Sequence, residues 1–138
     1  MAETVRKVDY FYIETPDKPG EGAKVLAALR DAGVSLVGFT AFPRGRWGAQ
    51  IDFIPEDTVA FKVSAKKAGL RLSTKKTGFL IQGEDRPGAF ADIMGKLAAV
   101  NINVTASDAV CAGEGRYGAM LWVKPADVRK AAKALGAT

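Results

Sequence analysis

The sequence predicts an α+β fold made of two similar units, because it repeats itself at the spacing of a small domain. The motif Asp-Lys-Pro-Gly at residues 17–20 returns as Asp-Arg-Pro-Gly at 85–88, an offset of 68 (85 − 17). Arg-Trp-Gly-Ala at 46–49 returns as Arg-Tyr-Gly-Ala at 116–119, an offset of 70 (116 − 46). Both pairs fall at the same place in the same order of expected strands and helices. Any site that the motif forms is therefore expected twice.

The first half reads as strand, helix, strand, strand, helix, strand. Aromatic and β-branched residues predict the strands, and apolar residues three or four positions apart, such as Val25 and Leu29, predict the helices. Gly33 and Gly69 are helix stops. The expected elements are a strand at 10–13, a helix from the turn at 16–20 to Gly33, strands at 34–42 and 49–54, a helix from 55 to Gly69 and a strand at 70–74.

The second half repeats this order up to its last helix. Asn101 stands where Gly33 ends the first helix, and Tyr117, which matches Trp47 at a turn exit, is expected to pack rather than to stack on a ligand. The turn at 112–115 is two residues longer than its counterpart, which accounts for the larger second offset. The expected elements are a strand at 79–81, a helix with Phe90, Ile93, Met94 and Leu97 on one face, strands at 102–111 and 119–123 and a helix over 125–135.

This order defines the split βαβ, or ferredoxin-like, unit, in which two helices cover one face of an antiparallel sheet. We expect one unit at 1–76 and a second at 77–138. The second half has no fourth strand of its own after its last helix. The segment 70–76 has no counterpart, so we expect it to be an edge strand that pairs with a first strand in its own or a partner's unit.

Alternation along the strands predicts an apolar surface on the sheet faces that no helix covers. Ile102 and Val104 should point toward the helices, which leaves Asn103, Thr105 and Ser107 on the other face. Apolar surface of this kind marks an interface, and a two-fold homodimer is the commonest way to bury it. The residues expected there are Tyr10, Tyr12, Val37, Phe39, Met120 and Trp122.

Composition argues against several classes of protein. The chain has no histidine and one cysteine, Cys111, so it lacks the usual parts of a Ser-His-Asp triad or a structural metal site. We expect no catalytic residues, no metal and no cofactor. No apolar run is long enough to span a membrane, and no leader pattern opens the chain. One cysteine fits a reducing compartment, so a cytoplasmic protein is expected, with Cys111 buried and inert.

The net charge of +5 raises nucleic acid as an alternative partner. A charged stretch of this kind is more often the solvated face of a helix and a protected sheet edge. No strand carries the aromatic pattern of an RNA-binding sheet, so nucleic acid binding is the less favoured interpretation. The basic residues concerned are Lys62, Lys66, Lys67, Arg71, Lys75 and Lys76.

The repeated Asp-x-Pro-Gly motif is the candidate binding element. Glycine lets the chain bring its amides close to another group, and the amides at a helix N-terminus attract carboxylate or phosphate. The alternative interpretation is a capped turn in which the Asp side chain accepts hydrogen bonds from the first amides of the helix. Two copies at the same place in a repeated unit favour binding.

The two halves resemble tandem ACT domains, which are ferredoxin-like modules that bind amino acids and regulate metabolic enzymes. The motifs at 17–20 and 85–88, each followed by a helix, carry the resemblance, together with the matching helix ends at 32–36 and 100–104. It covers nearly the whole chain. It implies a non-enzymatic module whose partners are a free amino acid, a second copy of the chain and a separate metabolic enzyme. An effect on the chain's own assembly is the other regulatory outcome.

The resemblance also implies which residues contact the ligand. In that family the amino acid lies against the loop before the first helix, at an interface between domains, and a polar residue opening the second strand contacts it. Ser35 stands where the second half has Asn103, which departs from the family pattern. The implied ligand-binding residues are Asp85, Arg86, Gly88, Ala89 and Asn103 in the second half, and Asp17, Lys18, Gly20, Glu21 and Ser35 in the first.

Overall fold

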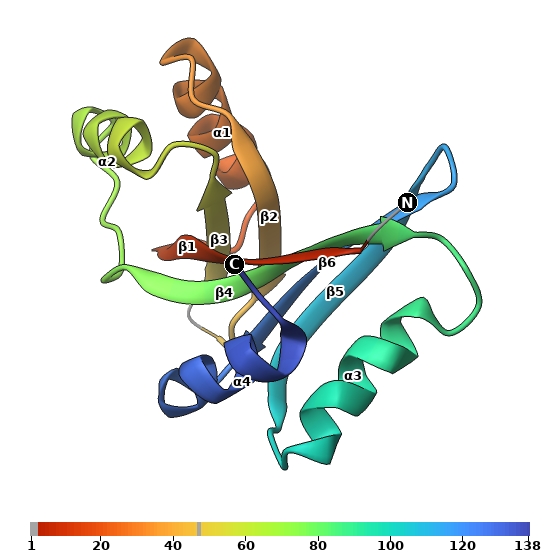
Figure 1. The fold of residues 1–138 in the computed structure, drawn as a ribbon. Helices are drawn as coiled ribbons and strands as arrows, with labels where there is room; N and C mark the ends of the chain where they lie inside the picture. The colour runs from red at the N-terminus through yellow and green to blue at the C-terminus, as the bar shows by residue number, and fades with distance from the viewer. Residues whose placement is uncertain (1–2, 47) are drawn as a thin grey trace. The chain divides into compact units, whose positions relative to one another are not determined.

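A computed structural model describes residues 3–46 and 48–138 (Figure 1). The predicted α+β fold is confirmed, with strand, helix, strand, strand, helix occurring twice along the chain. Trp47 lies outside the described residues. The elements are β1 (Thr4–Thr15), α1 (Glu21–Asp31), β2 (Leu36–Pro43), β3 (Ala49–Pro55), α2 (Thr58–Lys67), β4 (Lys76–Glu84), α3 (Ala89–Ala99), β5 (Val104–Gly113), β6 (Arg116–Val123), a short 3-10 turn (Pro125–Asp127) and α4 (Val128–Leu135).

The chain divides into two compact units. The N-terminal unit is Asp9–Lys76, and the C-terminal unit combines Met1–Val8 with Thr77–Thr138. Compared with the expected division after residue 76, the first eight residues thus belong with the second half. Strand β1 contributes residues to both units.

The first residues of β1 take the position of the fourth strand that the second half lacks. In the C-terminal unit the strands follow the order β1-β4-β6-β5. Val5 is buried in the same apolar cluster as Phe79 and Leu121. The end of the chain also bonds to this segment, because the Lys7 amide donates to the Thr138 carbonyl oxygen at 2.9 Å. The second half is therefore completed by the opposite end of the chain.

In the N-terminal unit, where β3 lies between β2 and β1, the segment 70–75 lies beside β1. The Ser73 amide donates to the Tyr12 carbonyl oxygen at 2.8 Å, and the Tyr12 amide donates to Ser73 Oγ at 3.0 Å. Leu70 and Leu72 pack against the core of this unit. The segment therefore lies beside the first strand of its own unit, as one of the two expected arrangements requires. It is not a regular strand, which begins only at Lys76.

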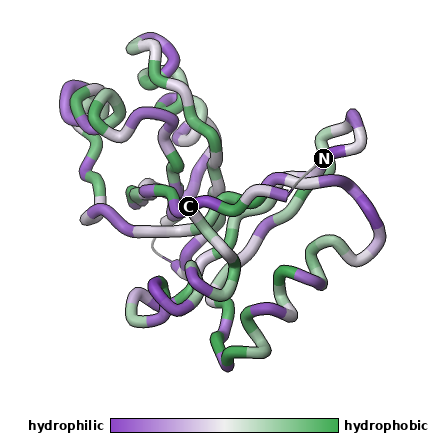
Figure 2. The backbone as a smooth tube through the Cα atoms, viewed as in Figure 1, coloured by the Kyte–Doolittle hydropathy of each residue, from purple (hydrophilic) through white to green (hydrophobic). Residues whose placement is uncertain are grey.

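Each unit has its core between the helices and one face of the sheet. The N-terminal core centres on Phe61 of α2, whose ring lies 5.5 Å from that of Phe11 and 5.4 Å from that of Phe53. In the C-terminal unit α3 buries Ala89, Ile93 and Leu97, and hydrophobic and hydrophilic residues alternate along this helix (Figure 2). The expected inward residues of β6, namely Ala119, Leu121 and Val123, are buried there too.

The two first helices end in the same way, as the repeat predicts. Gly33 adopts φ 73° and Asn101 adopts φ 60°, both in the left-handed region. In each case the next amide reaches back to the last turn: Val34 to the Leu29 carbonyl oxygen and Ile102 to that of Leu97, both at 3.0 Å. Asparagine tolerates this conformation better than most residues with a side chain.

A repeated β-bulge corrects two of the predicted face assignments. The register shifts between Leu36 and Gly38 in β2 and between Val104 and Ala106 in β5, which are equivalent positions (104 − 36 = 68). An extra residue on one strand moves every later side chain to the other face. The assignment of Phe39 and Ser107 to the helix-free face was therefore wrong. Phe39 packs on the core beside Phe53, and Ser107 pairs with the buried residue Leu121.

Candidate functional site

The loop at 85–88 brings the chain from β4 into α3 through a left-handed glycine. Gly88 is the N-cap of α3 with φ 77°, and no described side chain caps the helix. Backbone bonds close the turn instead, since the Ala89 amide donates to the Arg86 carbonyl oxygen at 3.1 Å. A Cβ placed on Gly88 would meet nothing within 4 Å. The interpretation of Asp85 as a helix cap is therefore wrong, and the space over Gly88 is open.

The loop at 17–20 has the same geometry in the N-terminal unit. Gly20 is the N-cap of α1 with φ 93°, again without a side-chain cap. The Glu21 amide donates to the Lys18 carbonyl oxygen at 3.4 Å, and the side chains of these two residues form a loose ion pair at 4.0 Å. Asp17 is exposed. The two copies of the motif therefore fold alike, and their side chains differ.

Arg86 lies within a cluster of charged and polar side chains in the C-terminal unit. Arg86 Nη2 donates to Asp92 Oδ2 at 2.5 Å on the exposed side of α3. Nearby, the Tyr117 hydroxyl donates to Glu3 Oε2 at 2.7 Å. Burial and this hydrogen bond raise the pKa of Tyr117 well above its usual range. The phenol therefore stays protonated and serves as a hydrogen-bond donor.

The sequence identified only part of this cluster. Tyr117 belongs to the repeated Arg-x-Gly-Ala motif, so the repeat could have pointed to it as a site residue. Its expected packing role is confirmed, because the side chain is buried. Asp92 was visible only as a polar residue on the exposed face of α3. Glu3 carried no signal, because its contact with Tyr117 joins residues from opposite ends of the chain.

Cys111 lies beside the loop and is exposed, so its expected burial was wrong. Cys111 lies near the end of the edge strand β5, where it pairs with Tyr117. The loop at 85–88 starts at the same end of the sheet, because Glu84 pairs with Arg116. A hydrogen bond with Asp85, together with partial desolvation and the negative charge of that carboxylate, raises the pKa of the Cys111 thiol. The Asp85 amide also donates to the Gly115 carbonyl oxygen at 2.8 Å. The loop is thus fixed against the β5–β6 turn, and the thiol is kept in its unreactive form.

The structure places Asn103 at the opposite end of β5 from the loop. Asn103 directly precedes Val104, which pairs with Val123, whereas the loop follows Glu84, which pairs with Arg116 near the other end of β5. Ten residues of β5 at about 3.3 Å each put the two positions about 30 Å apart. One ligand cannot touch both within one unit.

Ser35 and the loop at 17–20 are separated in the same way in the N-terminal unit. Ser35 precedes Leu36, which pairs with Pro55, whereas the loop follows Thr15, which pairs with Ala49 at the far end of β3. A ligand that contacts both a loop and the polar residue opening a second strand must therefore bridge two units or two chains.

A polar ladder crosses the helix-free face of the N-terminal unit. Thr40 Oγ1 and Gln50 Nε2 donate to the two oxygens of Asp52 at 2.7 and 3.0 Å. Arg44 Nη1 then donates to Gln50 Oε1 at 2.9 Å. Asp52 is the buried charged side chain of the described residues. Burial, followed by the negative charge of Asp52, raises the pKa of Tyr10.

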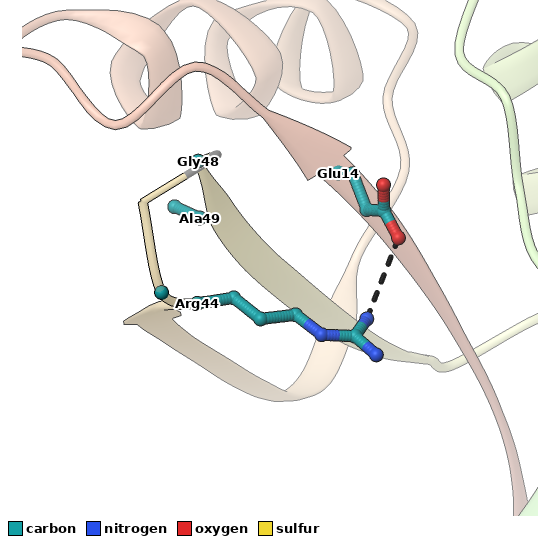
Figure 3. A pocket seen from close by; sticks show the side chains of 5 residues that line it. Glu14, Arg44, Gly48 and Ala49 are labelled. Atoms are coloured by element: carbon teal, nitrogen blue, oxygen red, sulfur yellow. Dashed lines mark hydrogen bonds and ion pairs between the residues drawn. The ribbon is translucent and has the colours of Figure 1, made fainter.

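The end of this ladder borders a pocket of about 340 Å³ (Figure 3). Arg44 extends across it from the β2–β3 hairpin toward Glu14 on β1, with Nη1 to Oε1 at 3.4 Å. Gly48 and Ala49 form the opposite wall. Among the described residues that line the pocket, Arg44 and Glu14 are the charged ones, and they form an exposed ion pair with each other.

The basic stretch lies on α2 and the segment that follows it. Phe61 and Ala65 are the buried residues of α2, and Lys62, Lys66 and Lys67 are exposed. This arrangement is that of a solvated helix face. Over residues 3–46 and 48–138 no helix is long and apolar enough to cross a membrane, and no group of three or more potential metal ligands occurs.

Comparison with known proteins shows the fold. No protein-family model matches the chain, and no curated protein sequence is significantly similar to it. Protein BT0572 from Bacteroides thetaiotaomicron superposes with a TM-score of 0.75 at 18% identity, over 97% of this chain and 88% of that one. The ligand-free regulatory subunit of aspartate kinase from Thermus thermophilus gives a TM-score of 0.63 at 18% identity, over 98% and 93%.

A third similar structure is aspartate kinase from Clostridium acetobutylicum, described as an allosteric enzyme. Its TM-score is 0.57 at 17% identity, over 97% of this chain and 33% of the kinase. The fold of this chain is therefore the ACT-type, ferredoxin-like fold that the sequence resemblance implied. It occurs in these proteins both as almost a whole regulatory subunit and as one third of a larger enzyme.

Proposed function

We propose that this chain is a regulatory module that binds a free amino acid and thereby modulates a metabolic enzyme or its own assembly. The observation that carries the proposal is the likeness of nearly the whole chain to the regulatory subunit of an aspartate kinase. The similar part of the larger kinase covers one third of that chain, which fits a module that acts on a catalytic partner. We propose a cytoplasmic, non-catalytic protein.

The loop at 85–88 is the proposed ligand-binding element of the C-terminal unit. Gly88 leaves open space above the start of α3, where amides of the first helical turn attract a carboxylate. The Ala89 amide is already bonded to the Arg86 carbonyl oxygen, so the carboxylate is expected to meet amides further along that turn. Arg86 supplies a cation at the same place, since its exposed ion pair with Asp92 is weak and exchangeable.

The proposed site is completed by a second copy of the chain. Asn103 lies about 30 Å from the loop of its own unit along β5, so only the Asn103 of a second chain can reach a ligand at the loop. Its side-chain amide offers both a donor and an acceptor to a zwitterion. A homodimer that places the helix-free surface around Met120 at an interface is the proposed assembly.

Calorimetry on matched variants tests the proposal. Asn103→Ala should weaken amino acid binding about fivefold, because one hydrogen bond is worth on the order of 1 kcal/mol. Gly88→Val should weaken it more, because a side chain occupies the open space and the left-handed backbone disfavours valine. Lys66→Ala, which removes an exposed cation of α2, is the control and should have no effect.

Two results would contradict the proposal. If the wild-type chain binds no amino acid at millimolar concentration, the function is wrong. If it binds one that neither Asn103→Ala nor Gly88→Val weakens, the loop at 85–88 is not the site. Sedimentation of the wild type with and without the amino acid reports whether binding changes its assembly.

A further inference from the structure

Helix α2 presents an aliphatic strip, made of Val59, Ala60 and Val63, to solvent. The core lies on the opposite side of the helix, where Phe61 and Ala65 are buried. Val59 is 74% exposed, Val63 is 51% exposed, and Ala60 is exposed as well. Of the large hydrophobic side chains in the described part of the chain, that of Val59 is the most exposed. Apolar side chains that lie singly on a surface need no explanation, whereas a group of them on one helix face does.

Lysine side chains border the strip. Lys62 and Lys66 lie along one side of it and Lys67 along the other, and all three are exposed. None of the three makes an ion pair with a described residue. Residues 58–76, which run from the start of α2 to the end of the segment after it, contain six lysines and arginines and no aspartate or glutamate. The border of the strip is therefore positively charged.

The equivalent helix of the C-terminal unit, α4, has charged residues in place of the strip. The buried residues of the two helices match at an offset of 70, as Phe61 and Ala131 show (131 − 61 = 70). At the same offset the three residues of the strip correspond to exposed cations, which are Arg129, Lys130 and Lys133. Helix α4 thus has the polar outer face that is typical of a surface helix. The fold does not require an aliphatic strip at this place, so the strip is particular to α2.

The combination of an aliphatic centre with a cationic border favours a protein as the partner of this surface. A nucleic acid backbone pairs with lysines, but it offers no aliphatic surface to the strip. Helices that bind membranes place bulky groups such as tryptophan, phenylalanine and leucine in the lipid, whereas the strip consists of valine and alanine. A protein interface has an apolar core inside a polar rim. A partner surface with aliphatic side chains between carboxylates therefore complements α2 in both respects.

The dimensions of the strip match those of one helix. Its side chains are short, whereas the lysines that border it are long. Two helices pack about 8–10 Å apart, depending on the side chains at the contact, and opposite charges that flank an apolar seam select the partner. The ten residues of α2 span about 15 Å, which is the length of about three turns of a second helix.

We propose that the aliphatic strip of α2 is a docking surface for an acidic amphipathic helix of a partner protein. Aliphatic side chains of that helix pack on Val59 and Val63, and carboxylates on its two flanks pair with Lys62, Lys66 and Lys67. The inference rests on the proposed function for the existence of a separate protein partner, and it names the surface that this partner contacts. Docking at the strip needs no amino acid ligand.

Binding of a synthetic helix to the full chain, measured by calorimetry, tests the proposal. The probe is a peptide of about four helical turns, stapled because so short a helix is marginal in water, with leucine on one face and glutamate on both flanks. It should bind the wild type, and more weakly as the salt concentration rises, because salt screens exposed charges. One control peptide has serine in place of leucine, and another has lysine in place of glutamate. Each should bind at least about tenfold more weakly.

A double variant that gives α2 the outer residues of α4 separates aliphatic packing from charge. Val59→Arg with Val63→Lys removes the aliphatic contact and adds positive charge. Binding of the acidic peptide should therefore weaken at least about tenfold, whereas binding by charge alone would strengthen. Both positions are exposed, and a circular dichroism spectrum checks that the variant is folded.

A second double variant tests the cationic border. Lys62→Gln with Lys66→Gln should weaken binding of the acidic peptide about fivefold at low salt, because two exposed ion pairs are lost. Arg129→Gln with Lys133→Gln removes two exposed cations one turn apart on α4. It is the matched control and should leave peptide binding unchanged.

Three outcomes would overturn the proposal. If Val59→Arg with Val63→Lys binds the acidic peptide as tightly as the wild type does, the strip is not the docking surface. If the peptide does not bind, while a DNA duplex or a phosphatidylglycerol vesicle binds the wild type and binds this variant more tightly, the partner is a nucleic acid or a membrane. If none of these probes binds, the outer face of α2 is a solvated surface only.

Calorimetry with amino acids separates this proposal from the proposed function. Val59→Arg with Val63→Lys leaves the loop at 85–88 intact and should leave amino acid binding unchanged. Peptide binding by a chain that binds no amino acid would refute the proposed ligand and leave the docking surface standing. Amino acid binding by a chain that binds no acidic peptide would refute the docking surface alone.

Discussion

The two units have similar helix-covered sheet faces and very different helix-free faces. On the helix side, equivalent positions are apolar in both units, as Phe11 and Ile13 are matched by Phe79 and Ile81. On the helix-free side, Asp52 of the polar ladder corresponds to Trp122 (122 − 52 = 70). The fold needs a packed core on one side of each sheet. The other side is free to diverge, as Asp52 and Trp122 show.

One pair of substitutions shows how this divergence is accommodated. In the C-terminal unit the Trp122 indole lies over Gly78, where a Cβ would come within 3.0 Å of Nε1. In the N-terminal unit the equivalent of Gly78 is Tyr10 (78 − 10 = 68), which lies close enough to Asp52 to feel its charge. A large and a small residue have exchanged places between the strands. Total volume is kept while polarity changes, which is the substitution that packed surfaces tolerate best.

Substitution of two equivalent glycines by alanine should reduce the free energy of unfolding by very different amounts. Gly48 adopts φ 152°, and a Cβ there would lie 2.3 Å from the Thr15 carbonyl oxygen. Gly48→Ala should lower the free energy of unfolding by on the order of 4 kcal/mol, from backbone strain and overpacking together. Gly118→Ala, its counterpart (118 − 48 = 70), should cost less than about 1 kcal/mol, since the nearest atom is 3.9 Å away.

Urea unfolding of both variants checks this prediction. Equal losses of stability in the two variants would contradict the difference in packing between the β1–β3 contact at Gly48 and the β4–β6 contact at Gly118.

The next effect concerns the polar ladder. Asp52→Ala removes the acceptor of the Thr40 hydroxyl and the Gln50 amide, which leaves both donors without this partner. We expect a loss of about 2 kcal/mol in the free energy of unfolding, because unsatisfied polar groups are costly when shielded from water. Thr40→Val with Asp52→Ala should recover part of the loss, since it removes one of the orphaned donors. Thermal unfolding of the single and double variants measures these changes in stability. An Asp52→Ala variant as stable as the wild type would show that the ladder does not stabilise the fold.

Sequence reasoning predicted the parts of the fold that depend on local chemistry. The Asp-x-Pro-Gly turns, the helix stops at Gly33, Gly69 and Asn101, and the order of elements follow from residues close in the chain. The bulges at Leu36–Gly38 and Val104–Ala106 have no such signature. The bulges place Phe39 and Ser107 on the helix-covered face of the sheet. Strict alternation had assigned both residues to the helix-free face, because it does not allow for an extra residue in the strand.

The candidate site was predicted less completely than the fold. The loops lie where the motif placed them, but the separation of Asn103 from Asp85 follows from the length of β5, which alternation alone does not give. The contact of Glu3 with Tyr117 depends on the first residues joining the second half. Each of these is a long-range feature that no short motif records.

The smallest expected change in stability comes from the hydrogen bond between Tyr117 and Glu3 in the C-terminal unit. Tyr117→Phe removes the hydrogen bond to Glu3 and should cost about 1 kcal/mol at neutral pH. The pKa of Tyr117 is raised in the folded state, so its stabilising contribution is complete below the unfolded pKa of about 10 and is lost as the pH rises above it. Wild type should therefore lose stability in alkali faster than Tyr117→Phe does. Because the pKa of Tyr10 is also raised, the variant should retain a smaller alkaline loss. Urea unfolding from pH 7 to 11 measures both, and identical pH profiles would contradict the assignment.

A thermal-shift screen of the wild-type chain against the common amino acids shows whether the folded chain binds one. A ligand that prefers the folded state must raise the apparent Tm with concentration. At a hundred times its dissociation constant the gain should be about 2.7 kcal/mol, which is easily seen in a protein of this size. We predict that at least one L-amino acid raises Tm and that its D-enantiomer raises it less. A flat response to every amino acid at millimolar concentration would contradict the account.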